Sequence, residues 1–150
     1  MTAMRGVGCV IALAALTLTL SGCGDGGRAE RRAALGPNPT FADYRKAADP
    51  AHGARLFNAC AGCHPISPGA LDRGGPNLFG IMGKPVATAS RRFGYSGALR
   101  AVGGRWTPEL MDRWVADPRK LAPRTSMNFQ GIGDPLDRAD LIAWMETQGR

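Results

Sequence analysis

The segment Cys60-Ala61-Gly62-Cys63-His64 brings two thiols and an imidazole within five residues of one another. This C-x-x-C-H spacing is the attachment sequence for a c-type haem. Two thiols separated by two residues can form thioether bonds with both vinyl groups on one edge of a porphyrin. The adjacent His64 then lies beneath the iron as its proximal ligand. The motif therefore predicts one covalently bound haem c, held by Cys60, Cys63 and His64.

Two other kinds of site also use a C-x-x-C pair. A thioredoxin-type dithiol requires a preceding strand within a βαβ unit, and the sequence before Cys60 has no such pattern. A zinc site requires a second pair of ligands, and the sequence contains no other closely spaced Cys/His pair. Haem attachment is therefore favoured over both.

The opposite face of the iron needs a ligand from elsewhere in the chain. The only other histidine, His52, precedes the motif on the same expected helix and is interpreted as a solvated residue at the helix start. Met111 and Met145 fall on apolar helix faces, where packing is the usual role of methionine. Met127 lies in an irregular loop, from which a side chain can be aimed inward. Because a His/Met pair is common in c-type cytochromes, His64 and Met127 are the predicted iron ligands.

Three dipeptides, Asp49-Pro50, Thr107-Pro108 and Asp134-Pro135, predict the helices that must position these groups. Each places a capping side chain directly before a proline at the first helical position. We expect helices over residues 50–59 and 108–116, and a third that ends before Gly149. The segments between them are rich in glycine and proline and show no convincing alternation typical of strands. The expected fold is all-α, small and loop-rich.

Composition limits the remaining possibilities. The chain has 150 residues and a formal net charge of +7; 44% of its residues are hydrophobic but only 7% are aromatic. This favours a single domain with a thin core, which a large flat cofactor would complete. A collagen-like chain, a disordered chain and a large multi-domain enzyme are excluded. No Ser/His/Asp set or carboxylate pair suggests catalysis, so an electron carrier is expected rather than an enzyme.

The N-terminal residues resemble a targeting signal. Residues 1–22 contain an apolar run of 14 residues over Val7–Leu20, which matches a secretory signal and is too short to remain as a spanning anchor. The run ends in Leu20-Ser21-Gly22-Cys23, which resembles a bacterial lipobox. We therefore expect an exported protein on the periplasmic side, anchored by lipid on Cys23. Ordinary signal cleavage, with Cys23 as a bystander thiol, is the alternative. Residues 23–48 are expected to form a flexible tether, and residues 49–150 the haem domain.

From about Asp49 to Arg150 the sequence resembles the class I cytochrome c family, close to its mitochondrial-like branch. The haem motif is followed by Gly75-Pro76-Asn77-Leu78 at the family spacing. The stretch Pro123-x-Thr125-x-Met127-x-Phe129 matches the loop that supplies the methionine ligand in the family. The resemblance implies the cytochrome c fold packed around one covalent haem.

The resemblance also implies roles for single residues. The carbonyl of Pro76 would accept a hydrogen bond from the His64 ring, which fixes its orientation and raises its basicity. Tyr95 and Trp106 fall where the family places donors to a buried haem propionate, and Thr125 belongs to the ligand loop. Plain core packing is the alternative for Tyr95 and Trp106.

The sequence departs from the family at two positions. Leu99 stands where many relatives carry an asparagine, and Trp114 where a tyrosine often approaches the methionine sulfur. Both changes remove polar partners from the distal side of the haem. They put the reduction potential in doubt, but not the fold.

The basic excess is interpreted as a docking surface. Arg73, Arg119 and Lys120 fall at family positions that ring the exposed haem edge, where they would attract an acidic partner. A generic solvated surface is the alternative for each. Neither nucleic acid nor a small-molecule substrate is expected.

Three functions are compatible with the sequence: a lipid-tethered carrier between membrane redox complexes, a stationary haem subunit of a larger complex, and a peroxidase or gas sensor with an opened distal site.

Overall fold

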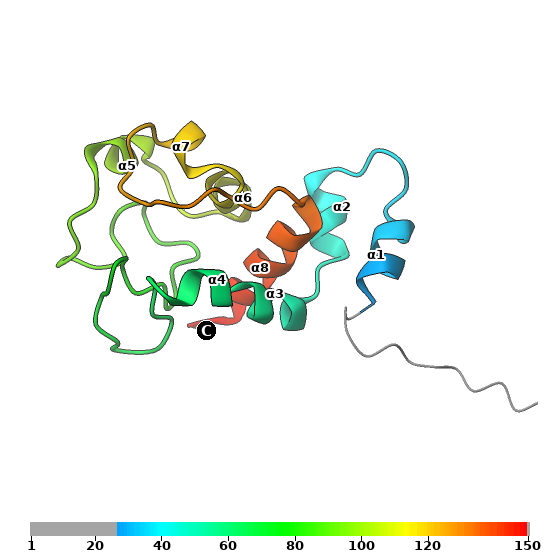
Figure 1. The fold of residues 1–150 in the computed structure, drawn as a ribbon, viewed down its shortest axis with the longest axis horizontal. Helices are drawn as coiled ribbons and strands as arrows, with labels where there is room; N and C mark the ends of the chain where they lie inside the picture. The colour runs from blue at the N-terminus through cyan, green and yellow to red at the C-terminus, as the bar shows by residue number, and fades with distance from the viewer. Residues whose placement is uncertain (1–26, 150) are drawn as a thin grey trace, which may run out of the picture.

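The helices of this protein are short and are joined by long loops (Figure 1). The structure, a computed structural model, describes residues 27–149. In that range the only β-type pairing is an isolated bridge between Pro85 and Arg105, so the expected all-α, loop-rich class is confirmed. The helices are α1 Arg28–Ala34, α2 Phe41–Lys46, α3 Pro50–Leu56, α4 Asn58–Ala61, α5 Gly97–Val102, α6 Pro108–Ala116, α7 Pro118–Leu121 and α8 Pro135–Thr147.

Capped prolines begin the helices that the sequence predicts. The side chains of Asp49, Thr107 and Asp134 each accept a hydrogen bond from a backbone N–H two or three residues further on. Each also precedes a proline at the start of its helix. This satisfies a donor that would otherwise lack a partner at the helix start.

The helix expected over residues 50–59 is in fact two helices. The α3 helix ends at Leu56 and α4 begins at Asn58, with Phe57 at the junction. The N–H of Cys60 donates to the carbonyl of Phe57 at 2.8 Å, a tight i to i+3 bond at the start of α4. Phe57 itself is buried against Trp144 of α8, with ring centroids 4.7 Å apart. The break therefore directs α4 while α3 stays packed on α8.

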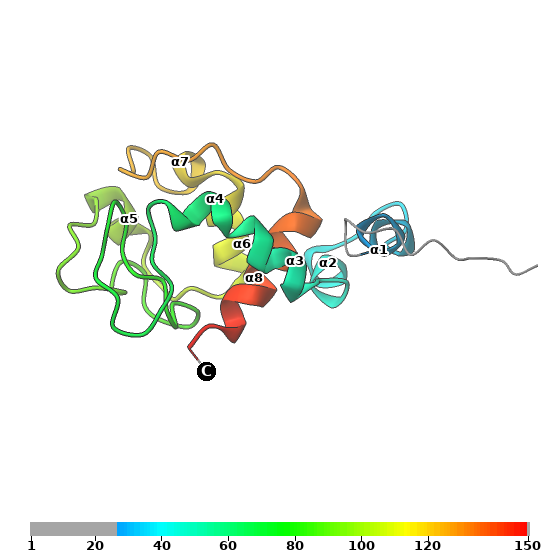
Figure 2. The same cartoon turned by 60° about the horizontal axis from the view of Figure 1, so that its bottom comes forward.

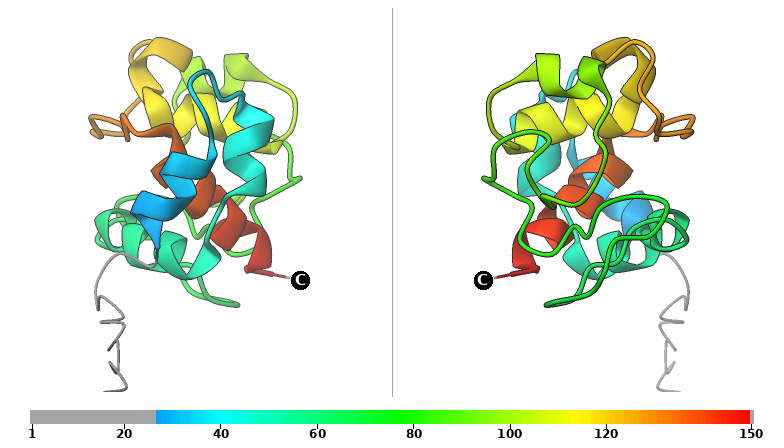
Figure 3. Two further views of the ribbon diagram at one scale, coloured as in Figure 1. Left: turned by 90° about the vertical axis from the view of Figure 1, so that its right-hand side faces the viewer. Right: turned by 90° about the vertical axis from the view of Figure 1, so that its left-hand side faces the viewer.

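The crossing of α3 and α8 depends on a glycine. A Cβ atom added to Gly53 would lie 2.0 Å from the backbone carbonyl oxygen of Asp140 and 2.9 Å from Cβ of Trp144. Only a residue without a side chain allows the two backbones to approach this closely. Figure 3 shows the two helices side by side. Because α3 leads into α4, this contact sets the position of the cysteine-bearing turn.

Residues 27–48, which we call the N-terminal arm, correct the expected flexible tether. The described part of that segment forms α1 and α2; α2 packs beside α8, whereas α1 lies further out at the end of the molecule (Figure 1) and is linked to α8 by side-chain ion pairs. The reason is charge pairing that local periodicity does not reveal: four arginines of the arm face four carboxylates on α8 or at its start. The pairs involve Arg28, Arg31, Arg32 and Arg45 on the arm and Asp134, Asp137, Asp140 and Glu146 on the α8 side. Residues 1–26, which carry the expected signal and Cys23, lie outside the described residues.

Two long irregular segments, residues 62–96 and 122–134, complete the fold. In the first, the Asn77 side-chain amide donates to the carbonyls of Ser67 at 2.8 Å and Ala70 at 3.0 Å, which ties the loop to itself.

Among the helices of residues 27–149, none combines the length and apolar character needed to cross a membrane.

Candidate functional site

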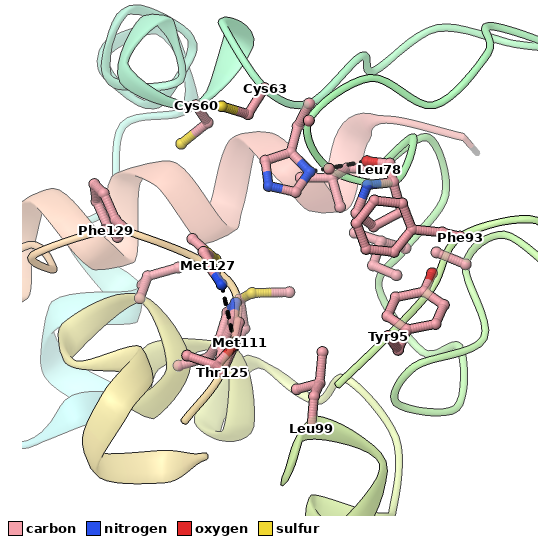
Figure 4. A pocket seen from close by; sticks show the side chains of 18 of the residues that line it. Cys60, Cys63, Leu78, Phe93, Tyr95, Leu99, Met111, Thr125, Met127 and Phe129 are labelled. Carbon is pink, nitrogen blue, oxygen red and sulfur yellow. Dashed lines mark hydrogen bonds between the residues drawn. The ribbon is translucent and has the colours of Figure 1, made fainter. Parts of the chain in front are cut away.

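An apolar cavity lies between α4, α6, α8 and the two irregular segments. Figure 4 shows its walls: Cys60 and Cys63 lie on one side, and Thr125 and Met127 on the opposite side. All eight residues that the sequence nominates for cofactor binding line this cavity, although they come from positions 60 to 127. They are Cys60, Cys63, His64, Pro76, Tyr95, Trp106, Thr125 and Met127.

The two thiols lie at the end of α4, where they do not form a disulfide with each other. The thiol of Cys60 is partly buried, and this burial raises its pKa, with the neighbouring Cys63 as a smaller cause. Cys63 is exposed. One thiol therefore faces the cavity interior and the other lies nearer its mouth, as attachment at one exposed edge of a flat cofactor requires.

The imidazole of His64 is fixed by the following loop. Its Nδ1 lies 2.9 Å from the carbonyl oxygen of Pro76, which can only accept, so Nδ1 carries the hydrogen. The lone pair of Nε2 is then free to bind a metal ion. A Cβ added to Gly75 would lie 2.2–2.7 Å from three atoms of the ring. The Gly75-Pro76 pair thus both supports the ring and sets its tautomer.

Met127 lies in the irregular segment 122–134, where hydrogen bonds at Thr125 order the backbone just before it. Its N–H donates to Oγ1 of Thr125 at 3.3 Å, and the N–H of Thr125 donates to the carbonyl of Ala122 at 3.0 Å. Figure 4 shows the first of these bonds on the wall opposite the cysteines. The side chain of Thr125 therefore orders the backbone at Met127.

Tyr95 and Trp106 are buried against the cavity, and each has a protein partner there. The hydroxyl oxygen of Tyr95 accepts from the N–H of Ser90 at 3.0 Å, and burial raises the pKa of this phenol. Trp106 packs on Trp114, with ring centroids 5.7 Å apart. The tyrosine keeps its hydroxyl hydrogen for a further acceptor. A role for either residue at a propionate stays a prediction.

Met111 is a cavity residue that sequence reasoning assigned to packing alone. It is 3% exposed and lines the same cavity as Met127. Leu99 and Trp114, the two departures noted above, line it as well. No local signal separates a core methionine from one that faces a cofactor, because both occupy the apolar face of a helix.

His52 is not the solvated residue that the sequence suggested. Its Nδ1 lies 2.8 Å from Oδ2 of Asp140, and its side chain is 15% exposed. It is absent from the cavity lining. Together with Asp137 and Asp140 it offers ligand atoms within 4.8 Å of one another. Both oxygens of Asp140, however, already accept from Arg31, so this cluster is an ion-pair site.

The three expected docking residues are exposed near the cavity. Arg73 precedes Gly74, which lines the cavity, and Arg119 donates to Asn128 of the lining at 2.8 Å. Lys120 follows on α7. Their positions are compatible with a basic rim, and their role in docking stays a prediction.

Comparison with known proteins identifies the family. A cytochrome c from Ulva intestinalis is 39% identical over 108 residues, which cover 71% of this chain and 96% of that protein. The chain belongs to the cytochrome c family. A cytochrome c homolog from Bradyrhizobium diazoefficiens is 35% identical over 95 residues; the match covers 63% of this chain and about half, 52%, of that relative.

A solved cytochrome c structure supports the same conclusion. Cytochrome cH from Methylobacterium extorquens has a TM-score of 0.62 and 34% identity, and the match covers 67% of this chain and 99% of that one. No family model matches the chain. The protein is accordingly a haem c electron carrier and not an enzyme. Two cavity thiols, one oriented imidazole and apolar walls fit this cofactor.

Proposed function

We propose that the protein is a membrane-anchored mono-haem carrier in which His64 and Met127 are the two axial ligands. One observation carries the ligand assignment: the cavity places Met127 on the wall opposite Cys60 and Cys63, on an irregular loop (Figure 4). An imidazole whose Nδ1 is already tied to Pro76 presents its second nitrogen as a ligand.

The haem, when bound, supplies a single iron that exchanges one electron reversibly. The chain provides the rest. Cys60 and Cys63 would hold one edge of the cofactor, and the hydrogen bond to the Pro76 carbonyl restrains rotation of the His64 ring. Buried apolar residues such as Trp106 and Ile81 exclude water from the interior. A thioether ligand raises the reduction potential relative to harder ligands. With both His64 and Met127 holding the iron, no position would remain for a substrate, which would agree with a carrier role.

Docking is proposed to use the exposed basic residues Arg73, Arg119 and Lys120, and the partner is a redox protein with an acidic face. Long-range attraction between such faces increases the encounter rate and is screened by salt. These residues belong to segments that also contribute to the cavity or touch its lining, so a partner bound there would approach the haem edge.

Export to the periplasmic side, with lipid on Cys23 as the anchor, is proposed from the sequence of residues 1–23. The docked N-terminal arm affects the choice between a mobile carrier and a stationary haem subunit. A long flexible tether would favour a mobile shuttle, but residues 28–48 form helices that are paired with α8 and do not supply such a tether. A mobile carrier exchanges among several partners, whereas a stationary subunit stays in one complex. Co-purification with one complex at fixed stoichiometry would favour the stationary subunit.

Paired substitutions test the ligand assignment. In purified holoprotein, Met127→Leu removes the sulfur with little change in volume, and Met111→Leu is the matched control in the same cavity. We expect the ferric iron–thioether charge-transfer band to disappear in the first variant and persist in the second. Loss of the band in Met111→Leu, with retention in Met127→Leu, would reverse the assignment.

A further inference from the structure

The N-terminal arm is held to the haem domain by ion pairs along α8. Arg31 forms a two-pronged contact with Asp140, with Nη1–Oδ1 at 2.8 Å and Nη2–Oδ2 at 3.0 Å. Nε of Arg28 lies 2.8 Å from Oδ1 of Asp137. Paired, planar contacts of the Arg31 type are among the stronger ones between side chains.

Further contacts extend the interface along the arm. Arg32 pairs with Asp134 at the start of α8, and Arg45 of α2 pairs with Glu146 near the end of α8, with Nη2–Oε2 at 2.7 Å. Burial opposes ionisation of Asp134, but its hydrogen bonds outweigh this effect and lower its pKa. The arm is thus fastened at both ends of α8.

Asp140 makes release of the arm unfavourable. Its side chain is 0% exposed and accepts hydrogen bonds from Arg31, from the N–H of Asp49 at 2.6 Å and from the His52 ring at 2.8 Å. Arg31 also donates to the carbonyl of Ala47 at 2.9 Å. Withdrawal of Arg31 would leave a buried carboxylate without its cation, which is strongly destabilising. The docked arm is therefore the resting state.

Docking leaves very little chain between the domain and the proposed anchor. Only residues 24–27 separate Cys23 from the first residue of α1, Arg28. Five Cα–Cα steps span at most about 17 Å. A flexible chain over residues 24–48 would instead have a root-mean-square span of about 25–30 Å and a much longer reach.

The arm also determines which end of the molecule would face the bilayer. In Figures 1 and 2, α1 lies at one end of the molecule, whereas α5 and the cavity-forming loops lie towards the other end. A short link at α1 would hold that end near the membrane. The cavity would then stand off the surface.

We propose that the docked arm fixes the orientation of the carrier, so that its redox partners are proteins of the same membrane whose redox centres stand above the bilayer. This inference rests on the proposed lipid anchor at Cys23. It differs from a freely swinging carrier, in which every face of the domain reaches the lipid surface.

Spin labels on lipidated holoprotein in vesicles test the orientation. With Cys60 and Cys63 in thioether bonds, Cys23 blocked by its lipid and Cys9 removed with the expected signal, an introduced cysteine is the only reactive thiol. Ala101→Cys labels the exposed surface of α5, and Ala33→Cys labels α1. Vesicles that carry a nickel-chelating lipid accelerate relaxation only of labels that approach the surface. We expect strong acceleration at position 33 and little at position 101.

Two insertions separate a docked arm from a flexible one. A ten-residue Gly/Ser insertion after Gly27 lengthens the link outside the arm, and the same insertion after Pro37 lengthens the loop between α1 and α2. The first should increase relaxation at position 101 at least twofold, and the second should leave it unchanged. Equal effects of the two insertions, or strong relaxation at position 101 without any insertion, would overturn the proposal.

Vesicle binding distinguishes the failure of this inference from the failure of the anchor itself. Mass spectrometry and co-sedimentation, with Cys23→Ser as the control, report on lipidation alone. Protein that carries lipid, binds vesicles and shows relaxation at position 101 equal to that at position 33 overturns the fixed orientation only. Protein without lipid overturns the anchor, and the orientation with it.

Discussion

Substitution of Gly53 by alanine should destabilise the domain by forcing α3 away from α8. The added Cβ would lie 2.0 Å from the carbonyl oxygen and 2.5 Å from the carbonyl carbon of Asp140. Contacts below 3.0 Å are essentially never seen for real Cβ atoms, so the backbones must separate by more than about 1 Å. Overpacking typically costs about 1–3 kcal/mol. Because the obstacle is backbone and not a flexible side chain, we expect the upper end, about 3 kcal/mol.

Thermal unfolding of the ferric holoprotein, followed by circular dichroism, measures this effect. For a domain of this size about 3 kcal/mol corresponds to a decrease in Tm of roughly 10–15 °C. Gly97→Ala is the matched control, since its added Cβ meets nothing within 4 Å at the start of α5. It should be neutral or slightly stabilising. A Gly53→Ala protein that melts within 2 °C of the control would refute the argument from close approach.

Three further outcomes are expected. Gly75→Ala should lower haem incorporation about tenfold or more, because its Cβ would collide with the His64 ring, whereas Gly74→Ala meets only ordinary contact at 3.4 Å; equal haem content in the two variants would contradict this. The lowered pKa of Asp134, from an ordinary 3.8, means that its contribution to arm docking is complete above that value and is lost as pH falls below it. A spin label at Ala33 should therefore become mobile only in acid, and mobility that rises above pH 5 would contradict the sign. Finally, stopped-flow transfer rates to a physiological partner should fall as ionic strength rises, and less steeply in Arg119→Gln; a flat profile would remove the steering role.

Much of the site was predictable because its chemistry is encoded locally. The C-x-x-C-H motif needs no distant residue to indicate haem attachment. The hydrogen bond between the Pro76 carbonyl and the His64 ring was implied only by the resemblance to the family, and the structure contains it. The capped prolines likewise predicted where α3, α6 and α8 begin.

The residues whose roles the sequence predicted wrongly, Arg31 and His52, have partners that are distant in sequence. Arg31 reads as a solvated residue until Asp140, 109 positions later, is brought to it. His52 reads as a helix-start residue for the same reason. Met111 shows the complementary limit, since helical periodicity reveals that a side chain is buried but not whether it faces protein or a cofactor.

The sequence by itself determined the presence of a covalent haem c and a helical, loop-rich class, because these follow from motifs of a few residues and from local capping; the proximal-ligand role of His64 is a prediction from the same motif. Only the tertiary structure decided that the arm is part of the folded domain. Electrostatic pairing acts through space, so the structural role of the Arg31 charge cannot be predicted from neighbouring residues. It follows only from the folded structure, which buries Asp140 beside Arg31.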